Sequence, residues 1–231
     1  MPSTELINNA FLAYDITGSL QAPLIITLHS GRGFGDHTSD FSAYAPLSKD
    51  NYRVVSFTYR GHGQSSRTKP FKRFTGADEA AAIEMLKTRL HRSPGLSVSM
   101  LQDKIFGAFK SDEEIRLVMH AAGPLYIEPG NFDADKALKR ILETVFNAEA
   151  HNGLYSDNDK FFDYRDELKS VTARTLVIVG EKDWICPPEQ SRTIAEGIFG
   201  ARLAVVPEAS HSVHLEKNEV VLGEIRGVSK A

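Results

Sequence analysis

The strongest chemical signal in the sequence is an acid and a base that each follow a predicted strand near the end of the chain. Asp183 comes shortly after the apolar run at residues 175–180, and His211 follows a second run at residues 201–207. One helix and one strand separate them, so both side chains should lie at the same edge of neighbouring parallel strands. An aspartate that accepts a hydrogen bond from an imidazole fixes its tautomer, as a general base for acyl transfer requires. We therefore predict a catalytic pair, although each residue taken alone is more simply a helix cap or a polar loop residue.

A glycine-rich loop is the second chemical signal. The His-Ser-Gly-Arg-Gly stretch at residues 29–33 follows the apolar run at residues 24–28. At this position, the backbone N–H groups of Ser30 and Gly31 would face a developing oxyanion. An ordinary strand-to-helix turn has the same glycine spacing, so the spacing alone does not decide between the two interpretations.

The elements that position these residues predict an α/β fold with a helical insertion. Alternating side chains at residues 11–17 indicate an N-terminal hairpin. The runs at residues 24–28, 54–59, 175–180 and 201–207 are nearly continuous and β-branched, which is typical of strands covered on both faces. Residues 78–155 instead show helical spacing, so we expect three parts: residues 1–77 and 156–231 form the sheet, and residues 78–155 form a cap.

Helix signals within the proposed cap are specific enough to test. Leu138, Ile141, Leu142 and Val145 fall on one helical stripe. Ser111 with Glu114 three residues later has the form of a capping box that opens a helix. After the cap, the prolines at residues 187–188 predict a helix that begins with proline in its first turn.

Bulk composition excludes several partner classes. The chain has 231 residues, of which 27 are Lys or Arg and 30 are Asp or Glu, and no block of five or six like charges occurs. We therefore expect neither nucleic acid nor anionic membrane as a partner. Cys186 is the only cysteine, and no apolar run approaches the ~20 residues of a membrane-spanning helix. A soluble protein of the cytoplasm is the expectation.

The whole chain resembles the proline iminopeptidase group of α/β-hydrolases, which are serine peptidases. That group has a His-Gly-Gly-Pro-Gly oxyanion loop, an Arg-Gly-x-Gly loop, a helical cap, and an aspartate and a histidine late in the chain. Residues 60–65 match the second loop, and residues 180–188 and 209–214 match the acid-bearing and base-bearing turns. Residues 29–33 replace one glycine and the proline of the oxyanion loop, which sets this chain apart from enzymes specific for proline.

The resemblance implies a fold, a mechanism and a substrate class. The fold would be that of an α/β-hydrolase, with a mostly parallel sheet and a helical cap. A serine would attack the carbonyl, His211 would shuttle the proton, Asp183 would hold His211, and no cofactor or metal would be needed. Substrates of relatives are small peptides, amides or esters, and some relatives release N-terminal proline.

Two further residues are candidates for substrate binding. By resemblance, a cap carboxylate such as Glu149 would receive the substrate's amino group, whereas a solvated helix end is the simpler interpretation. Trp184 follows Asp183 directly and would line the pocket or pack in the core.

The nucleophile expected of this family is missing. No Gly-x-Ser-x-Gly motif occurs, and only the eleven residues 67–77 separate the second loop from the cap. The expected strand, nucleophile elbow and flanking helices need roughly 50 residues at ordinary element lengths. We therefore predict an internally shortened α/β-hydrolase that lacks two central strands. Without them, the strands at residues 24–28 and 175–179 must either pair directly or leave open, apolar edges.

Three residues are alternative nucleophiles, and each has a simpler structural interpretation. Ser97 resembles an elbow serine only superficially and is better placed as a helix N-cap. Ser30 lies in the oxyanion loop, where its hydroxyl would point from the wrong strand. Cys186 is close to Asp183 and precedes two prolines, so we expect a packed side chain.

Two functions from different classes remain open. The first is a serine hydrolase whose sequence lost an internal segment by misprediction, splicing or deletion. The second is a non-catalytic remnant that acts as a binding module. Retention of both Asp183 and His211 favours the first, since an abandoned site need not keep either residue. In both cases we expect little or no activity from the chain as it stands.

Overall fold

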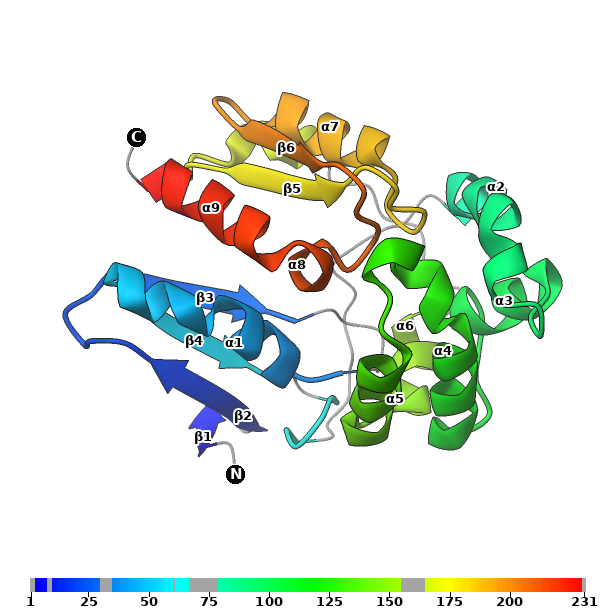
Figure 1. Ribbon diagram of the computed structural model, residues 1–231. Coiled ribbons are helices and arrows are strands. Elements are labelled where there is room, and N and C mark those ends of the chain that lie inside the picture. The colour runs from blue at the N-terminus through cyan, green and yellow to red at the C-terminus, as the bar shows by residue number, and fades with distance from the viewer. Residues whose placement is uncertain are drawn as a thin grey trace. The chain divides into compact units, whose positions relative to one another are not determined.

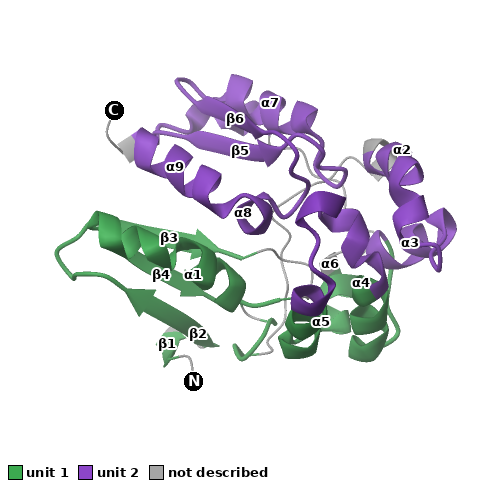
Figure 2. Cartoon of the chain, viewed as in Figure 1, with its two compact units in different colours: residues 1–73, 107–120, 138–160 green, residues 74–106, 121–137, 161–231 purple. Residues whose placement is uncertain are grey.

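A computed structural model of the protein describes residues 3–7, 10–29, 35–59, 61–66, 79–154 and 165–229 (Figure 1). The chain divides into two compact units (Figure 2). Unit 1 comprises Met1–Arg73, Gly107–His120 and Leu138–Lys160, and unit 2 comprises Phe74–Phe106, Ala121–Ala137 and Phe161–Ala231. The division into an N-terminal sheet part, a cap and a C-terminal sheet part stays a prediction.

Strands lie towards both ends of the chain, and the described part of its middle is helical. The strands are β1 (Ser3–Ile7), β2 (Ala10–Thr17), β3 (Leu24–Leu28), β4 (Arg53–Phe57), β5 (Leu176–Gly180) and β6 (Arg202–Val206). The α-helices are α1 (Thr38–Tyr44), α2 (Glu79–Arg89), α3 (Val98–Ile105), α4 (Asp112–Tyr126), α5 (Ala134–Glu143), α6 (Ala148–Leu154), α7 (Pro188–Gly197), α8 (Val213–Glu216) and α9 (Asn218–Ser229). Short 3-10 helices are η1 (Ala45–Asp50), η2 (Leu90–Arg92), η3 (Pro129–Asn131) and η4 (Arg165–Ser170).

Unit 1 contains a mixed four-stranded sheet with the order β1-β2-β4-β3. The pairs β1–β2 and β2–β4 are antiparallel, whereas β3 and β4 are parallel. The predicted N-terminal hairpin is therefore confirmed, and the predicted strands at residues 24–28 and 54–59 are adjacent. Ile26 of β3 lies opposite Val55 of β4. Strand β3 comes last in the strand order, so it is an edge strand of this sheet.

Strand β3 is covered on one face only. Helix α1 packs against β3 and β4 (Figure 1). Side chains alternate between the faces of a strand, so Leu24, Ile26 and Leu28 share a face. Their exposed fractions are 54%, 56% and 61%. In the described part of the chain, the expectation that this strand is covered on both faces is wrong, because nothing packs against the face that carries these three residues.

Unit 2 contains a parallel two-stranded sheet, in which Gly180 of β5 lies opposite Val206 of β6. Helix α7 packs against both strands, and α9 packs against β5 (Figure 1). The strands predicted at residues 175–180 and 201–207 are thus confirmed. Helix α7 begins at Pro188 with proline in its first turn, also as predicted. None of the five residues of β5 is exposed.

The predicted helix starts in the central segment are largely confirmed. The Ser97 hydroxyl accepts a hydrogen bond from the Met100 N–H at 3.1 Å, which makes it the N-cap of α3. The Ser111 hydroxyl likewise accepts from the Glu114 N–H at 3.1 Å and opens α4. The Glu114 carboxylate accepts from the N–H of Lys110, where a complete capping box would use the N–H of Ser111.

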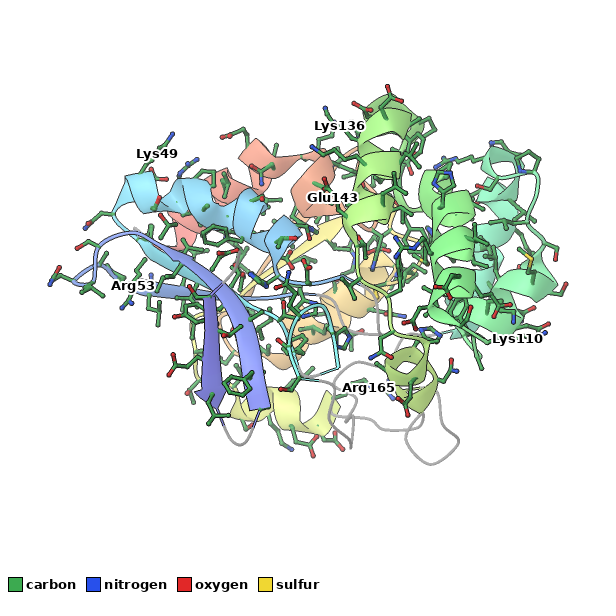
Figure 3. All side chains as sticks on the ribbon, turned by 90° about the horizontal axis from the view of Figure 1, so that it is seen from below. Lys49, Arg53, Lys110, Lys136, Glu143 and Arg165 are labelled. Atoms are coloured by element: carbon green, nitrogen blue, oxygen red, sulfur yellow. The ribbon has the colours of Figure 1, made fainter. Side chains whose placement is uncertain are left out.

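Helix α5 carries three of the four residues of the predicted apolar stripe and buries none of them, whereas Val145 lies beyond the end of the helix. Leu138 and Leu142 are 44% and 65% exposed, and no residue of the helix is buried. Charged side chains flank the stripe, with Lys136 near the start of the helix and Glu143 at its end (Figure 3). In unit 1, the Arg116 side chain donates to the Ile141 carbonyl oxygen at 2.8 Å and joins α4 to α5.

Candidate active site

The Asp183 carboxylate is fixed by the main chain of its own turn. Its backbone N–H donates to the Gly180 carbonyl oxygen at 3.1 Å, just past the end of β5. Its Oδ1 atom accepts from the N–H groups of Ile185 at 2.9 Å and Cys186 at 3.0 Å. Only 5% of Asp183 is exposed, so these bonds form largely out of water. Two N–H donors compensate the burial of a carboxylate and hold it in one orientation.

His211 contacts this carboxylate at hydrogen-bond distance, as predicted. Its Nδ1 atom lies 3.0 Å from Oδ2 and 3.1 Å from Oδ1 of Asp183. An N–H at Nδ1 that donates to Asp183 leaves the lone pair on Nε2. Among the described residues, His211 hydrogen-bonds to Asp183 alone, and a third of its side chain is exposed. The Asp183 carboxylate therefore holds the imidazole in one orientation, and its role as a general base stays a prediction.

The turns that carry the acid and the base are joined through their backbones. The N–H of Glu181 donates to the Val206 carbonyl oxygen, and that of Lys182 to the Ala209 carbonyl oxygen, both at 2.9 Å. A Cβ atom on Gly180 would lie 2.2 Å from the Ser210 carbonyl oxygen. Only glycine lets these two turns approach so closely.

A buried arginine, which sequence analysis did not single out, bridges the same two turns. Arg89 ends α2 and is 6% exposed. One terminal nitrogen of its guanidinium, Nη1, donates to the Ser210 hydroxyl at 3.0 Å, and the other, Nη2, donates to the Lys182 carbonyl oxygen. Nη1 also lies 2.9 Å from Oε1 of Glu128. Burial lowers the pKa of the Arg89 guanidinium, and the nearby Glu128 carboxylate opposes that shift.

Two carboxylates, those of Glu128 and Glu216, extend the polar contacts around Arg89. Glu128 also pairs with Arg92, with an Nη2 to Oε2 distance of 3.2 Å. Glu216 accepts from the N–H of Ser210 through Oε1 and from the N–H of Glu128 through Oε2, both at 2.9 Å. The residue directly before His211 is thus held by its hydroxyl and by its backbone.

An aromatic pair packs beside the acid and base. Trp184 is fully buried, and its ring lies 5.3 Å from that of Tyr126, which in turn lies 5.8 Å from the His211 ring. The Trp184 Nε1 atom has no hydrogen-bond partner among the described residues. This placement fits the core alternative for Trp184, and its role in substrate binding stays a prediction.

The predicted oxyanion residues Ser30 and Gly31 lie outside the described residues, as do Arg60 and residues 67–78. His29, which precedes them, is 4% exposed. Its Nε2 atom accepts from the Tyr59 N–H at 3.1 Å. In unit 1, the chain leaving β3 is thereby fixed to the chain leaving β4.

The other candidate residues do not reach His211 by a hydrogen bond in the described part of the chain. Glu149 is exposed on α6, in unit 1. Ser97 caps α3, as predicted from its sequence context. Cys186 is half-buried beside Asp183 and donates its backbone N–H to that carboxylate.

Unit 1 holds a second arrangement of an aspartate, a histidine and a hydroxyl. His37 is 1% exposed, its Nδ1 atom lies 2.5 Å from Oγ1 of Thr58, and its Nε2 atom lies 3.1 Å from Oδ2 of Asp15. Thr58 is fully buried, so its hydroxyl is not accessible to a substrate. This series anchors the start of α1. Nearby on α1, burial and the neighbouring Asp36 raise the pKa of Asp40 to about 6.

Within the described ranges, no three His, Cys, Asp or Glu side chains are grouped so that they could hold a metal ion. No helix among the described residues is long and apolar enough to cross a membrane.

The fold matches that of solved α/β-hydrolases. An esterase from Exiguobacterium antarcticum aligns with a TM-score of 0.66 at 17% identity, covering all of both chains. An enol-lactonase from Burkholderia xenovorans aligns at 0.65 and 20% identity, covering 99% of this chain and all of the other. A hydrolase from Pseudomonas aeruginosa aligns at 0.68 and 20% identity, covering 100% of this chain and 98% of the other. The predicted fold class, an α/β-hydrolase, is confirmed.

Sequence comparison places the chain within this class. No family model matches it. It is 45% identical over 273 residues to a proline iminopeptidase of Pestalotiopsis fici, PfmaB, covering 95% of this chain and 96% of the relative. A pimeloyl-[acyl-carrier protein] methyl ester esterase of Neisseria meningitidis is 29% identical over 118 residues, which is 50% of this chain and 45% of that enzyme. The chain therefore belongs to the proline iminopeptidase-like α/β-hydrolases. This membership supports the interpretation of the chain as a hydrolase.

The aligned length shows that the relative from Pestalotiopsis fici is the longer chain. An alignment of 273 positions exceeds the 231 residues of this chain. The difference is 42, so the relative has at least that many residues with no counterpart here.

Proposed function

We propose that this chain is a proline iminopeptidase-like serine hydrolase in which Asp183 orients His211 as the general base. The observation that carries the proposal is the contact between His211 Nδ1 and Asp183 Oδ2 at 3.0 Å, with the aspartate buried. Two N–H donors fix the carboxylate, so the imidazole receives a defined tautomer. A base in this orientation takes a proton from a nucleophile and later returns it to a leaving group.

The remaining roles follow from the family. A serine would attack an amide or ester carbonyl, and the N–H groups of Ser30 and Gly31 would stabilise the oxyanion. Glu149 would receive the amino group of a small peptide, and Trp184 would line the pocket. The single cysteine, Cys186, fits a cytosolic compartment.

We further propose that the chain as it stands does not catalyse this reaction. No Gly-x-Ser-x-Gly motif occurs in the sequence. The surplus of at least 42 residues in the relative supports a missing internal segment, which we place at residues 67–77. The exposed face of β3 supports the same proposal, because a segment that packs there in a complete enzyme would be absent.

A non-catalytic binding module is the second candidate function. The absent nucleophile motif favours it, since such a module needs none. The intact contact between Asp183 and His211 favours the hydrolase, because a binding module has no need of an oriented base.

A chimera separates the two candidates. The unmatched residues of the Pestalotiopsis fici relative would be inserted between Arg67 and Asp78, and proline arylamide and aryl ester hydrolysis measured. We expect background rates from the chain itself and clear turnover from the chimera. His211→Gln should lower the rate of the chimera by about 10²- to 10⁴-fold, because general-base catalysis is lost.

Two outcomes would contradict this proposal. A chimera that is folded by circular dichroism yet inactive would favour the binding module. Turnover by the unmodified chain that disappears in Ser97→Ala or Cys186→Ala would instead identify an unconventional nucleophile.

A further inference from the structure

Arg89 contacts the two residues that come directly before Asp183 and His211 in the sequence. Lys182 directly precedes the acid, and Ser210 directly precedes the base. One guanidinium nitrogen reaches the Lys182 carbonyl oxygen and the other reaches the Ser210 hydroxyl at 3.0 Å. Ser210 in turn donates to the same Lys182 carbonyl oxygen at 3.1 Å. Arg89 therefore ties together the two turns that set the distance between Asp183 and His211.

We propose that Arg89 is a positioning residue that holds Asp183 and His211 in contact by bridging the turns on which they lie. It touches neither reacting group, and it acts through the backbone of one turn and the side chain of the other. The proposal rests on the proposed function only in taking the Asp183–His211 contact as the functional one.

The chemistry of the guanidinium explains why an arginine is found here. Its planar fork presents several N–H donors in a fixed geometry, so it can donate to Ser210, Lys182 and Glu128 at once. An ammonium group keeps the charge opposite Glu128, but as a point charge on a flexible stem it does not hold all three partners. The function of Arg89 therefore depends on the shape of its donor group as well as on its charge.

Arg92 provides a matched control three residues away. It pairs with the same Glu128 carboxylate, at 3.2 Å, and makes no hydrogen bond to Lys182 or Ser210 among the described residues. Arg89→Lys and Arg92→Lys thus both keep a positive charge beside Glu128, and only the first removes the bridge.

The test is solvent exchange of the His211 Nδ1 proton, followed by proton NMR on the full chain. The resonance is assigned by its loss in His211→Gln. We expect the proton to exchange about tenfold faster in Arg89→Lys, equivalent to about 1.4 kcal/mol of local opening, with Arg92→Lys unchanged. Ser210→Ala, which removes one arm of the bridge, should give a smaller acceleration.

Exchange within twofold of the wild-type rate in Arg89→Lys would overturn the proposal. Equal acceleration in Arg89→Lys and Arg92→Lys would also overturn it, because it would show a general loosening around Glu128. If Arg89→Lys does not fold, the exchange rate in Ser210→Ala is compared with that in Arg92→Lys. Faster exchange in Ser210→Ala alone would support the proposal, and equal rates would overturn it. No step requires turnover, so failure of the proposed hydrolase leaves this test intact.

Discussion

Strands β3 and β5 have similar sequences and different surroundings. Both are five-residue parallel strands of mainly branched apolar side chains, Leu-Ile-Ile-Thr-Leu and Leu-Val-Ile-Val-Gly. Helices α7 and α9 pack against β5, and none of its residues is exposed. On β3, α1 covers one face, and Leu24, Ile26 and Leu28 are more than half exposed.

The difference shows that an apolar run indicates a strand suited to burial on both faces. It does not show whether the rest of the chain supplies segments that cover those faces. The sequence of β3 calls for cover on two faces, and the described part of the chain supplies one. Strand β5 receives its cover from α7, which follows it directly, and from α9 at the end of the chain. Four changes break or sharpen this comparison.

The largest effect is expected at the end of β5. In Gly180→Ala, the new Cβ would lie 2.2 Å from the Ser210 carbonyl oxygen and 2.5 Å from that of Ala209. Both are backbone atoms, so the two turns must separate. We expect a loss of at least about 3 kcal/mol in the free energy of unfolding, measured by urea titration with circular dichroism.

Gly223→Ala on α9 is the control for that substitution. Its Cβ would meet nothing within 4 Å, and the residue is an exposed helical glycine. A gain of up to about 1 kcal/mol is expected. Similar behaviour of the two variants would show that the close approach at Gly180 is not a constraint.

The second effect is a pH dependence of stability that arises from Asp40 on α1, the helix that packs against β3. The pKa of Asp40 is raised to about 6 from 3.8, first by burial and then by Asp36. The unfolded chain therefore loses this proton at lower pH than the folded one. The free energy of unfolding therefore falls by up to about 3 kcal/mol as pH rises from about 4 to about 6, and it levels off above that pH.

Asp40→Asn removes this titration. The stability of the variant relative to wild type should increase by up to about 3 kcal/mol between pH 4 and pH 7, measured by urea unfolding at each pH. Asp135→Asn, which removes an exposed carboxylate of α5, is the control for the substitution itself. If the pH profiles of Asp40→Asn and wild type ran parallel, a raised pKa of the Asp40 carboxyl would be excluded.

The third effect tests the exposed face of β3 directly. An edge strand with an apolar face invites association, so we expect the protein to self-associate at ~10 µM and above. Ile26→Lys should reduce this association, seen by sedimentation velocity, because a charged lysine discourages edge pairing.

Leu117→Lys on α4 is the matched control for Ile26→Lys, since Leu117 is 69% exposed and lies far from β3 in sequence. It should leave self-association unchanged. A wild-type protein that stays monomeric with a sharp melt would contradict the expectation that the exposed face of β3 causes self-association.

The smallest effect concerns the two turns beside Asp183 and His211. The Lys182 and Glu208 side chains lie 2.6 Å apart on the surface of these turns. The Glu208 partner raises the pKa of Lys182, and Lys182 lowers that of Glu208. Glu208→Gln should nevertheless leave the melting temperature within experimental error, because solvent screens exposed pairs. A clear drop in calorimetry would show that this pair helps to hold the turns.

The sequence predicted the parts of the fold that depend on local signals. The strand runs, the N-cap Ser97, the start of α7 at Pro188 and the contact of Asp183 with His211 all follow from short motifs or strand ends. Arg89 was not predicted, because its contacts with Lys182, Ser210 and Glu128 join residues far apart in the sequence and no spacing indicates them. The same holds for Glu128 and Glu216, which look like ordinary surface acids until the turns are folded.

The burial of β3 could not be predicted for a different reason. Its own residues satisfy every rule for a covered strand, and the cover depends on chain that lies elsewhere. The apolar stripe of α5 failed in the same way, since Leu138 and Leu142 remain exposed although their spacing is that of a packed helix.

Trp184 gives the molecule an intrinsic optical probe. It is the only tryptophan of the chain, it is fully buried in unit 2, and it packs on Tyr126, whose ring makes an edge contact with that of His211. Indole emission excited apart from tyrosine therefore reports on the surroundings of the acid and base alone. Because unit 1 has no tryptophan, a fluorescence melt follows unit 2, and circular dichroism of the same sample follows both. Non-coincidence of the two curves would show directly that β3 and β5 unfold in separate steps.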